Sequence, residues 1–99
     1  MPPQLKAGTR FEVPDGGKHK YVALVPDPDA PGGVRRVKFG ARAYEHYADQ
    51  VPPELGGGRW AALDHGDPER RRRYRLRHGA QGYQTRRYSP AWFSWHFLW

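Results

Sequence analysis

A run of arginines is the clearest set of chemistry-bearing residues in this chain. On a helix, where successive side chains turn by about 100°, these arginines point to several sides, while Tyr74 and His78 share one side and Leu76 points nearly opposite. A free surface helix instead shows one apolar stripe and one charged face. Some of the arginines must therefore meet phosphates, carboxylates or aromatic rings. The candidate contact residues are Arg70, Arg71, Arg72, Arg73, Arg75 and Arg77, followed by Arg86 and Arg87.

Two kinds of partner fit this arginine run. One is the phosphate backbone of a nucleic acid, which binds basic surfaces through its charge. The other is protein, either another part of this chain or a neighbouring subunit, because arginine is enriched at protein interfaces. Residues 50–99 hold 9 basic and 4 acidic side chains, against 8 and 6 in residues 1–49, so the excess charge is concentrated around this run.

An aromatic cluster ends the sequence. Its residues are Trp92, Phe93, Trp95, Phe97 and Trp99. The tryptophans are spaced as neighbours on a helix, the two phenylalanines are four residues apart, and the segment is apolar nearly all round, which indicates burial on most sides. It is either a core helix or an anchor that inserts into a neighbouring protein, since tryptophan dominates interface hot spots.

Histidine and aspartate occur together at His65, Asp67 and His78, a combination found in metal sites and nucleases. The spacing matches no established metal motif, and the chain has no cysteine to supply thiolate ligands. We therefore expect structural roles, with His65 and Asp67 organising the turn before a helix and His78 closing its end. There is no phosphate-binding glycine loop, paired carboxylate or nucleophile elbow. We expect no metal, no cofactor and no enzymatic activity.

Two helices have clear start signals. Asp67 and Pro68 form a cap and first-turn pair for a helix over residues 67–78, and Gly79 is expected just beyond its end. Ser89 and Pro90 repeat the start signal for a terminal helix over residues 90–98.

The first half of the chain predicts a β-hairpin. Strand-like residues 20–25 and 34–39 flank a loop rich in proline and glycine, and residues 9–13 have the composition of a further short strand. Gly40 is expected to break the second strand. Residues 41–49 are then predicted as a short helix with Tyr44 and Tyr47 on one face. Trp92, Phe93, Leu98 and Phe39 should be among the most buried side chains.

The fold class expected from these elements is α+β, a small single domain with a β-hairpin followed by two or three short helices. Residues 1–19 are expected to form an irregular, extended segment rich in proline and glycine, and residues 20–99 the domain. Aromatic residues make up 14% of the 99 residues, which argues against disorder although only 37% are hydrophobic. The chain shows no membrane-spanning stretch, no secretory signal and no disulfide framework, and so predicts an intracellular protein.

Three blocks of residues follow one another along the second and later parts of the chain. They are Arg36-Val37-Lys38-Phe39-Gly40 with Tyr44 and Tyr47; His65, Asp67, Arg70, Tyr74, Arg77 and His78; and Trp92-Phe93-Ser94 with Leu98 and Trp99.

The order of these blocks resembles that in a family of small, basic, uncharacterised proteins of large double-stranded DNA viruses, of the nucleocytoplasmic large DNA virus type. The resemblance covers residues 20–99, and the chain departs from it in its proline-rich hairpin loop, in Gly56–Gly58 and in having arginine where such proteins tend to have lysine. It implies a viral context but no established activity.

Two functions follow, with the first favoured. The protein is expected to be a minor structural component of a virion that cements or bridges capsid proteins through its arginine-rich helix and aromatic C-terminus. The alternative is a nucleic-acid-binding or genome-packaging protein with the same helix on phosphates. A nuclease centred on His65, Asp67 and His78 ranks third. The expected location is the virion, and otherwise the host cytoplasm or nucleus.

Overall fold

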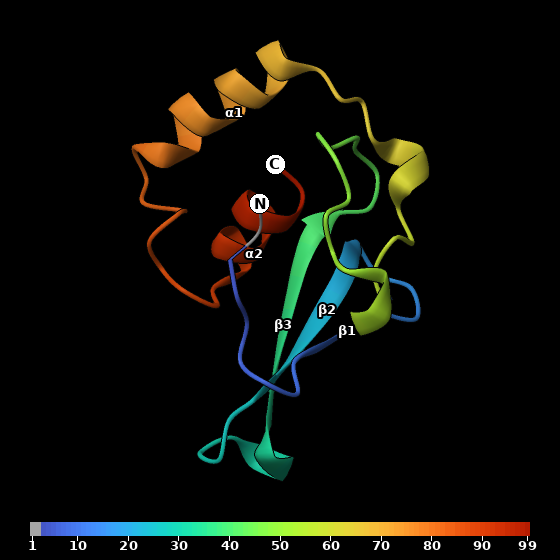
Figure 1. The fold of residues 1–99 in the computed structure, drawn as a ribbon, viewed down its shortest axis with the longest axis vertical. Coiled ribbons are helices and arrows are strands. Elements are labelled where there is room, and N and C mark those ends of the chain that lie inside the picture. Colours follow the sequence, from blue (N-terminus) through green and yellow to red (C-terminus); the bar gives the residue numbers. More distant parts are fainter. Residues whose placement is uncertain (1–2) are drawn as a thin grey trace.

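The computed structural model describes residues 3–99, which form a three-stranded antiparallel sheet followed by two helices (Figure 1). The strand order is β1-β2-β3, and short 3-10 turns lie at Pro31–Gly33, Pro53–Leu55 and Ala61–Leu63. The predicted α+β class is confirmed. The elements are β1 (Arg10–Glu12), β2 (His19–Pro26), β3 (Val34–Ala41), α1 (Pro68–Gly79) and α2 (Pro90–Phe97).

One face of the sheet carries the core. In β3, Val37 and Phe39 are buried while Lys38 between them is exposed, because alternate side chains of a strand point to opposite faces. The register places Tyr21 opposite Phe39. β1 pairs with β2 and adds the buried Phe11 to the same core, so residues 10–12 belong to the sheet.

Helix α2 packs on this face of the sheet. Phe93 stacks on Phe39, with ring centroids 5.2 Å apart, and meets Phe11 edge-on at 5.9 Å. Such aromatic pairs stabilise a core by about 0.5–1.5 kcal/mol each beyond the area they bury. Trp92 and Leu98 are also buried, which confirms the predicted set of most buried residues.

Residues 41–49 do not form the predicted helix, and that prediction is wrong, because Ala41 ends β3 and the residues after it form no helix. Backbone groups of this segment bond instead to distant parts of the chain. The His46 N–H donates to the Leu63 carbonyl at 3.2 Å, and the Ala48 N–H donates to the Leu98 carbonyl at 3.1 Å. Because carbonyl groups of distant segments accept from these N–H groups, the N–H groups are satisfied without the hydrogen bonds of a helix. Tyr44 is 71% exposed.

Gly40 does not end β3, which continues to Ala41. Gly40 has a φ of +79°, which disfavours any residue with a Cβ, and a Cβ there would lie 2.8 Å from Leu98 Cδ1. It would also lie 3.2 Å from Lys20 Cβ on the paired strand. The glycine is therefore required by close packing inside the sheet rather than by a break in it.

Gly79 is the last residue of α1 rather than the first residue beyond it, and Ala80 caps the helix. A Cβ at Gly79 would lie 3.3 Å from the ring of Trp95. The glycine therefore allows the end of α1 to approach α2 closely.

Replacing Gly40 with alanine tests this packing. Gly17 is the matched control, because its φ of +82° imposes the same strain but no atom lies within 4 Å of the position that a methyl group would take there. Gly17→Ala should lower the free energy of unfolding by about 1–2 kcal/mol. Gly40→Ala should cost about 1–3 kcal/mol more, because the methyl group also overpacks Leu98. Urea denaturation measures both, and equal losses would contradict the packing argument.

Candidate functional site

Two arginines of α1 turn inward and fasten the helix to the end of α2. The Arg71 guanidinium lies 4.6 Å from the ring centroid of Tyr47, and its Nε donates to the main-chain oxygen of Trp99 at 2.7 Å. The Arg75 guanidinium lies 4.9 Å from the ring centroid of Trp95 and donates to the same oxygen at 3.2 Å. Arg71 and Arg75 therefore stabilise the attachment of α1 to the rest of the domain.

Three other arginines form ion pairs on the surface. Arg70 bonds Glu45 at 2.9 Å, while Arg72 at 2.5 Å and Arg73 at 3.5 Å share Glu69. Exposed pairs of this kind contribute about 0–1 kcal/mol each. These ion pairs hold the guanidinium groups only weakly, so a carboxylate or phosphate from outside the chain can replace the carboxylates of Glu45 and Glu69.

The last three arginines lie near the end of α1 and in the loop before α2. Arg77 is exposed and donates to the ring Nε2 of His78 at 3.2 Å. Arg87 donates to the Gln4 carbonyl and lies 5.1 Å from the ring centroid of Tyr88. Arg86 is exposed.

Leu76 lies on the outer side of α1 and is 64% exposed. Arg72 and Arg73 precede it by four and three residues, so all three share the outward face of the helix. Tyr74, on the opposite side, is the only buried residue of α1. The helix thus presents an apolar side chain framed by guanidinium groups.

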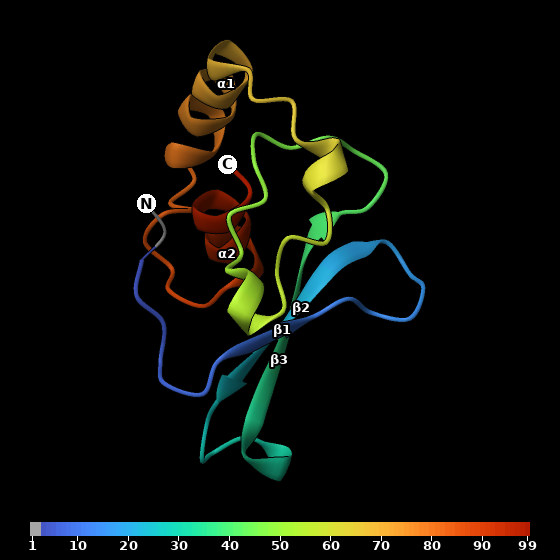
Figure 2. The same cartoon turned by 45° about the vertical axis from the view of Figure 1, so that its right-hand side comes forward.

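A column of aromatic rings joins α1 to the end of the chain. Tyr74 stacks on Trp99 with centroids 4.3 Å apart and planes 2° apart. His78 continues the column, 4.4 Å from Tyr74 and 4.4 Å from Tyr83. The ring of His65 also contacts Trp99, with centroids 5.2 Å apart. Figures 1 and 2 show α1 standing away from the sheet, so these side chains hold it in place.

His65 and Asp67 shape the turn before α1. The Asp67 N–H donates to His65 Nδ1 at 2.9 Å, and the Asp67 carboxylate caps α1 by accepting the N–H groups of Glu69 and Arg70. His78, at the other end of the helix, bonds Gln81 through its Nδ1. These three residues do not converge on one point.

The aromatic C-terminus is largely part of the core. Trp92, Phe93, Trp95 and Phe97 are buried within this chain, and Trp99 is half-buried against Tyr74. The apolar surface of the four buried residues is therefore already covered within this chain. Of the five, only Trp99 keeps part of its apolar surface exposed.

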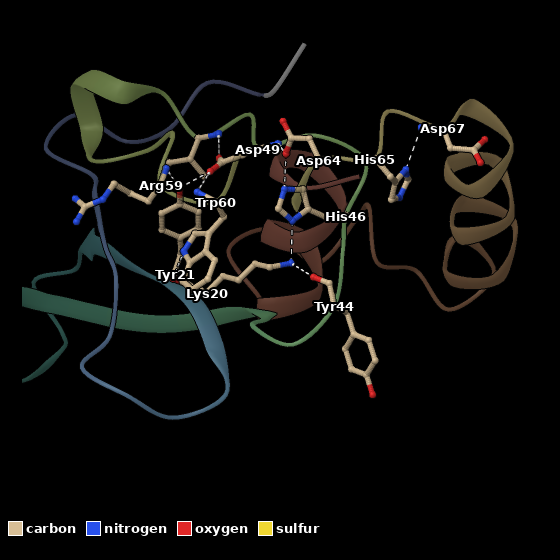
Figure 3. A network of polar contacts seen from close by, with 11 residues as sticks. Lys20, Tyr21, Tyr44, His46, Asp49, Arg59, Trp60, Asp64, His65 and Asp67 are labelled. Carbon is tan, nitrogen blue, oxygen red and sulfur yellow. Dashed lines mark hydrogen bonds and ion pairs between the residues drawn. The ribbon is translucent and has the colours of Figure 1, made fainter. Parts of the chain in front are cut away.

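A buried polar network, which sequence reasoning missed, lies beside the sheet (Figure 3). Lys20 is 2% exposed, and its Nζ donates to the Tyr44 carbonyl at 2.6 Å and to His46 Nδ1 at 2.8 Å. His46 Nε2 lies 2.6 Å from Asp64 Oδ1. Because Nδ1 accepts from Lys20, the neutral imidazole carries its proton on Nε2 and donates it to Asp64.

Asp49 extends the network to Tyr21 in β2 and to Trp60 in the segment between β3 and α1. Its Oδ2 accepts the Tyr21 hydroxyl at 2.5 Å and the Trp60 N–H at 3.0 Å, and its own N–H donates to Asp64 at 2.7 Å. Asp64 is therefore linked to the ammonium of Lys20 through the imidazole of His46, while Asp49 bonds the phenol of Tyr21.

Burial sets the protonation states of this network. It lowers the pKa of Lys20 to about 8, against the opposing charges of Asp49 and Asp64. It lowers the pKa of His46, as does the charge of Lys20, although Asp64 opposes both. Burial and the bond to Asp49 raise the pKa of Tyr21. At neutral pH the lysine is therefore charged and the histidine neutral.

No local spacing signals this network. Lys20 opens the predicted hairpin, His46 falls in the segment predicted as a helix, and Asp64 lies in a connector. The one signal in the sequence is a lysine in an otherwise apolar strand, which is uncommon at a buried position unless the charge is paired.

Within residues 3–99, no three or more histidine, cysteine or carboxylate side chains gather closely enough to hold a metal ion. The same part of the chain has no helix with the length and apolar character needed to cross a membrane. Comparisons with protein-family models, curated proteins and solved structures find no match. The viral resemblance stays a prediction.

Replacing Asp67 with alanine should lower the free energy of unfolding by about 1 kcal/mol, because two N–H groups at the start of α1 lose their acceptor. Asp15→Ala, in the exposed turn after β1, is the control and should have little effect. Thermal or urea denaturation compares the two, and an unchanged stability of Asp67→Ala would count against the cap.

Lowering the pH should destabilise the fold through His46. The unfolded chain takes up a proton at this residue below about pH 6.5, whereas the folded chain holds it neutral, so the free energy of unfolding falls as the pH drops below that value. Burial lowers the pKa of His65 and His96 as well. His46→Gln should therefore reduce the slope by up to about 1 kcal/mol per pH unit, without abolishing it.

Urea denaturation at a series of pH values measures that slope. Ala62→Gln, which adds the same side chain at an exposed position and removes no titratable group, is the control and should keep the slope of the parent protein. A His46→Gln slope identical to the parent's would show that the imidazole is not held neutral.

Proposed function

We propose that this protein is a minor structural component of a virion that bridges two neighbouring capsid proteins. The observation that supports this proposal is a pair of exposed apolar side chains, each beside exposed arginines, at the two ends of the molecule. The viral setting rests on the sequence resemblance.

The first contact surface is the outward face of α1, where Arg72 and Arg73 frame Leu76. Interfaces between proteins combine apolar contacts with arginine, and arginine is enriched among the residues that dominate their affinity. The weak ion pairs of Arg72 and Arg73 with Glu69 can exchange for carboxylates of a partner.

The second contact surface is the tip of the β-hairpin. Val34, at the start of β3, is 39% exposed, and the exposed Arg35 and Arg36 follow it. The molecule measures 41 Å along its longest axis, and Figures 1 and 2 both show α1 at one end of that axis and the hairpin tip at the other. A bridging protein needs two such separated surfaces.

Nucleic-acid binding is the second candidate. Several exposed basic side chains, among residues 3–99, have no carboxylate within 4.0 Å, and they include Arg35, Arg36, Lys38 and Arg86. Such side chains can bind the phosphates of a nucleic acid. A protein that neutralises about five phosphates shows a slope of log K against log salt near −4 to −5.

Aspartate substitutions at the two surfaces test the bridge. Leu76→Asp and Val34→Asp should each reduce incorporation into purified virus particles by about tenfold, since a charge in an interface core costs more than about 1.4 kcal/mol. Ala62→Asp is the control, because it adds the same charge at an exposed site on neither surface, and should incorporate normally. Quantitative mass spectrometry of particles measures incorporation.

Sub-micromolar binding of random-sequence duplex DNA by the isolated protein, with a steep salt dependence, would favour nucleic-acid binding instead. In that case Arg35→Ala and Arg36→Ala should flatten the salt dependence, and Leu76→Asp should leave it unchanged. Normal incorporation of Leu76→Asp and Val34→Asp would reject the bridging proposal.

A further inference from the structure

A cavity of about 930 Å³ lies between the sheet and the two helices. Its walls come from the start of β2, from the end of β3 with the loop through Glu45, from the last turns of α1 and from α2. This volume is in the range of sites that bind small molecules, about 300–1,000 Å³. The cavity lies between the two contact surfaces proposed above and does not include Leu76 or Val34.

The walls of the cavity combine apolar rings with positive charge. The rings of Tyr74 and Trp99 and the side chain of Leu98 supply apolar surface, and Tyr44 stands exposed among the lining residues. Glu45 is the single carboxylate of the lining and is already bonded to Arg70. The basic side chains of the lining are Lys18, Lys20, Lys38, Arg42 and Arg77.

Lys20 is a buried cation whose bonding is incomplete. An ammonium group has three N–H donors, and within residues 3–99 only the Tyr44 carbonyl and the His46 imidazole accept from it. Both acceptors are neutral, and no carboxylate in this part of the chain lies within 4.0 Å of its Nζ. Buried charges in proteins are normally paired. Asp64, the nearest carboxylate in the network, is separated from Lys20 by the ring of His46 (Figure 3).

We propose that this cavity binds a small organic anion with an apolar body, and that its carboxylate or sulfonate group accepts a hydrogen bond from the free N–H of Lys20. The apolar body packs against Tyr74, Trp99 and Leu98. The anion supplies the direct counter-charge that the protein itself does not place against Lys20. The one carboxylate among the lining residues, Glu45, is already paired with Arg70, and this favours an anion over a cation.

Two fluorescent probes with the same aromatic framework test this site. One is 8-anilinonaphthalene-1-sulfonate, and the other is N-phenyl-1-naphthylamine, which lacks the sulfonate. The sulfonate should bind about tenfold more tightly or better, because a hydrogen bond between charged groups is worth at least that factor. Fluorescence titration of the full chain measures both affinities.

Lys20→Met should abolish the preference for the sulfonate and leave the affinity for the neutral probe unchanged. Lys18→Met is the matched control, since it removes an equal charge from an exposed residue that also lines the cavity, and should keep most of the preference. Equal affinity of the parent protein for the two probes, or an equal effect of the two substitutions, would overturn the proposal.

If Lys20→Met does not fold, the pH dependence of probe binding to the parent protein tests whether Lys20 binds the sulfonate. The pKa of Lys20 is about 8, and the groups that face its ammonium are His46, Asp64 and Asp49 of the network. Affinity for the sulfonate should therefore fall as the pH rises from about 7 to about 9, a range in which arginine and exposed lysine side chains stay charged. Binding of the neutral probe should not change. A sulfonate affinity that is constant over this range would reject the role of Lys20.

Discussion

The packing of α2 against the sheet is the interaction on which the rest of this structure depends. A chain with few aliphatic residues builds its core from stacked aromatic rings, with Phe93 on Phe39 at the centre. Once α2 is placed, its last residues supply bonding partners to other segments. Phe97 accepts a main-chain bond from Gln50, and Trp99 receives the stacked ring of Tyr74 and the guanidinium of Arg71.

The polar network compensates for the scarcity of regular structure between β3 and α1. Asp49 and Asp64 accept main-chain and side-chain donors from segments that no helix or strand organises. A buried network of this kind stabilises only when its members are satisfied. Lys20 meets that condition in part, since its two acceptors are neutral, and this leaves a charged group beside the cavity between the sheet and the two helices.

The arginines of α1 divide into two sets with different consequences. Arg71 and Arg75 are used within the domain, where they lie over aromatic rings and bond Trp99. Arg72 and Arg73 remain at the surface, held by weak pairs and flanking Leu76. A charged segment in sequence is therefore not one binding surface, because part of its charge serves the attachment of the helix that carries it.

Local signals in the sequence were sufficient to predict the hairpin and both helices. The alternation around Phe39, the Asp67–Pro68 start and the Ser89–Pro90 start each depend on neighbouring residues only. The sequence also placed the aromatic terminus among segments that must be buried. It could not predict that residues 41–49 do not form a helix, because the backbone partners of this segment lie elsewhere in the chain. Nor could it reveal the bonds among Lys20, His46 and Asp64, or which arginines turn inward. Those features arise only when α2 and the sheet bring distant residues together, and the burial that results then lowers the pKa of Lys20 and of His46.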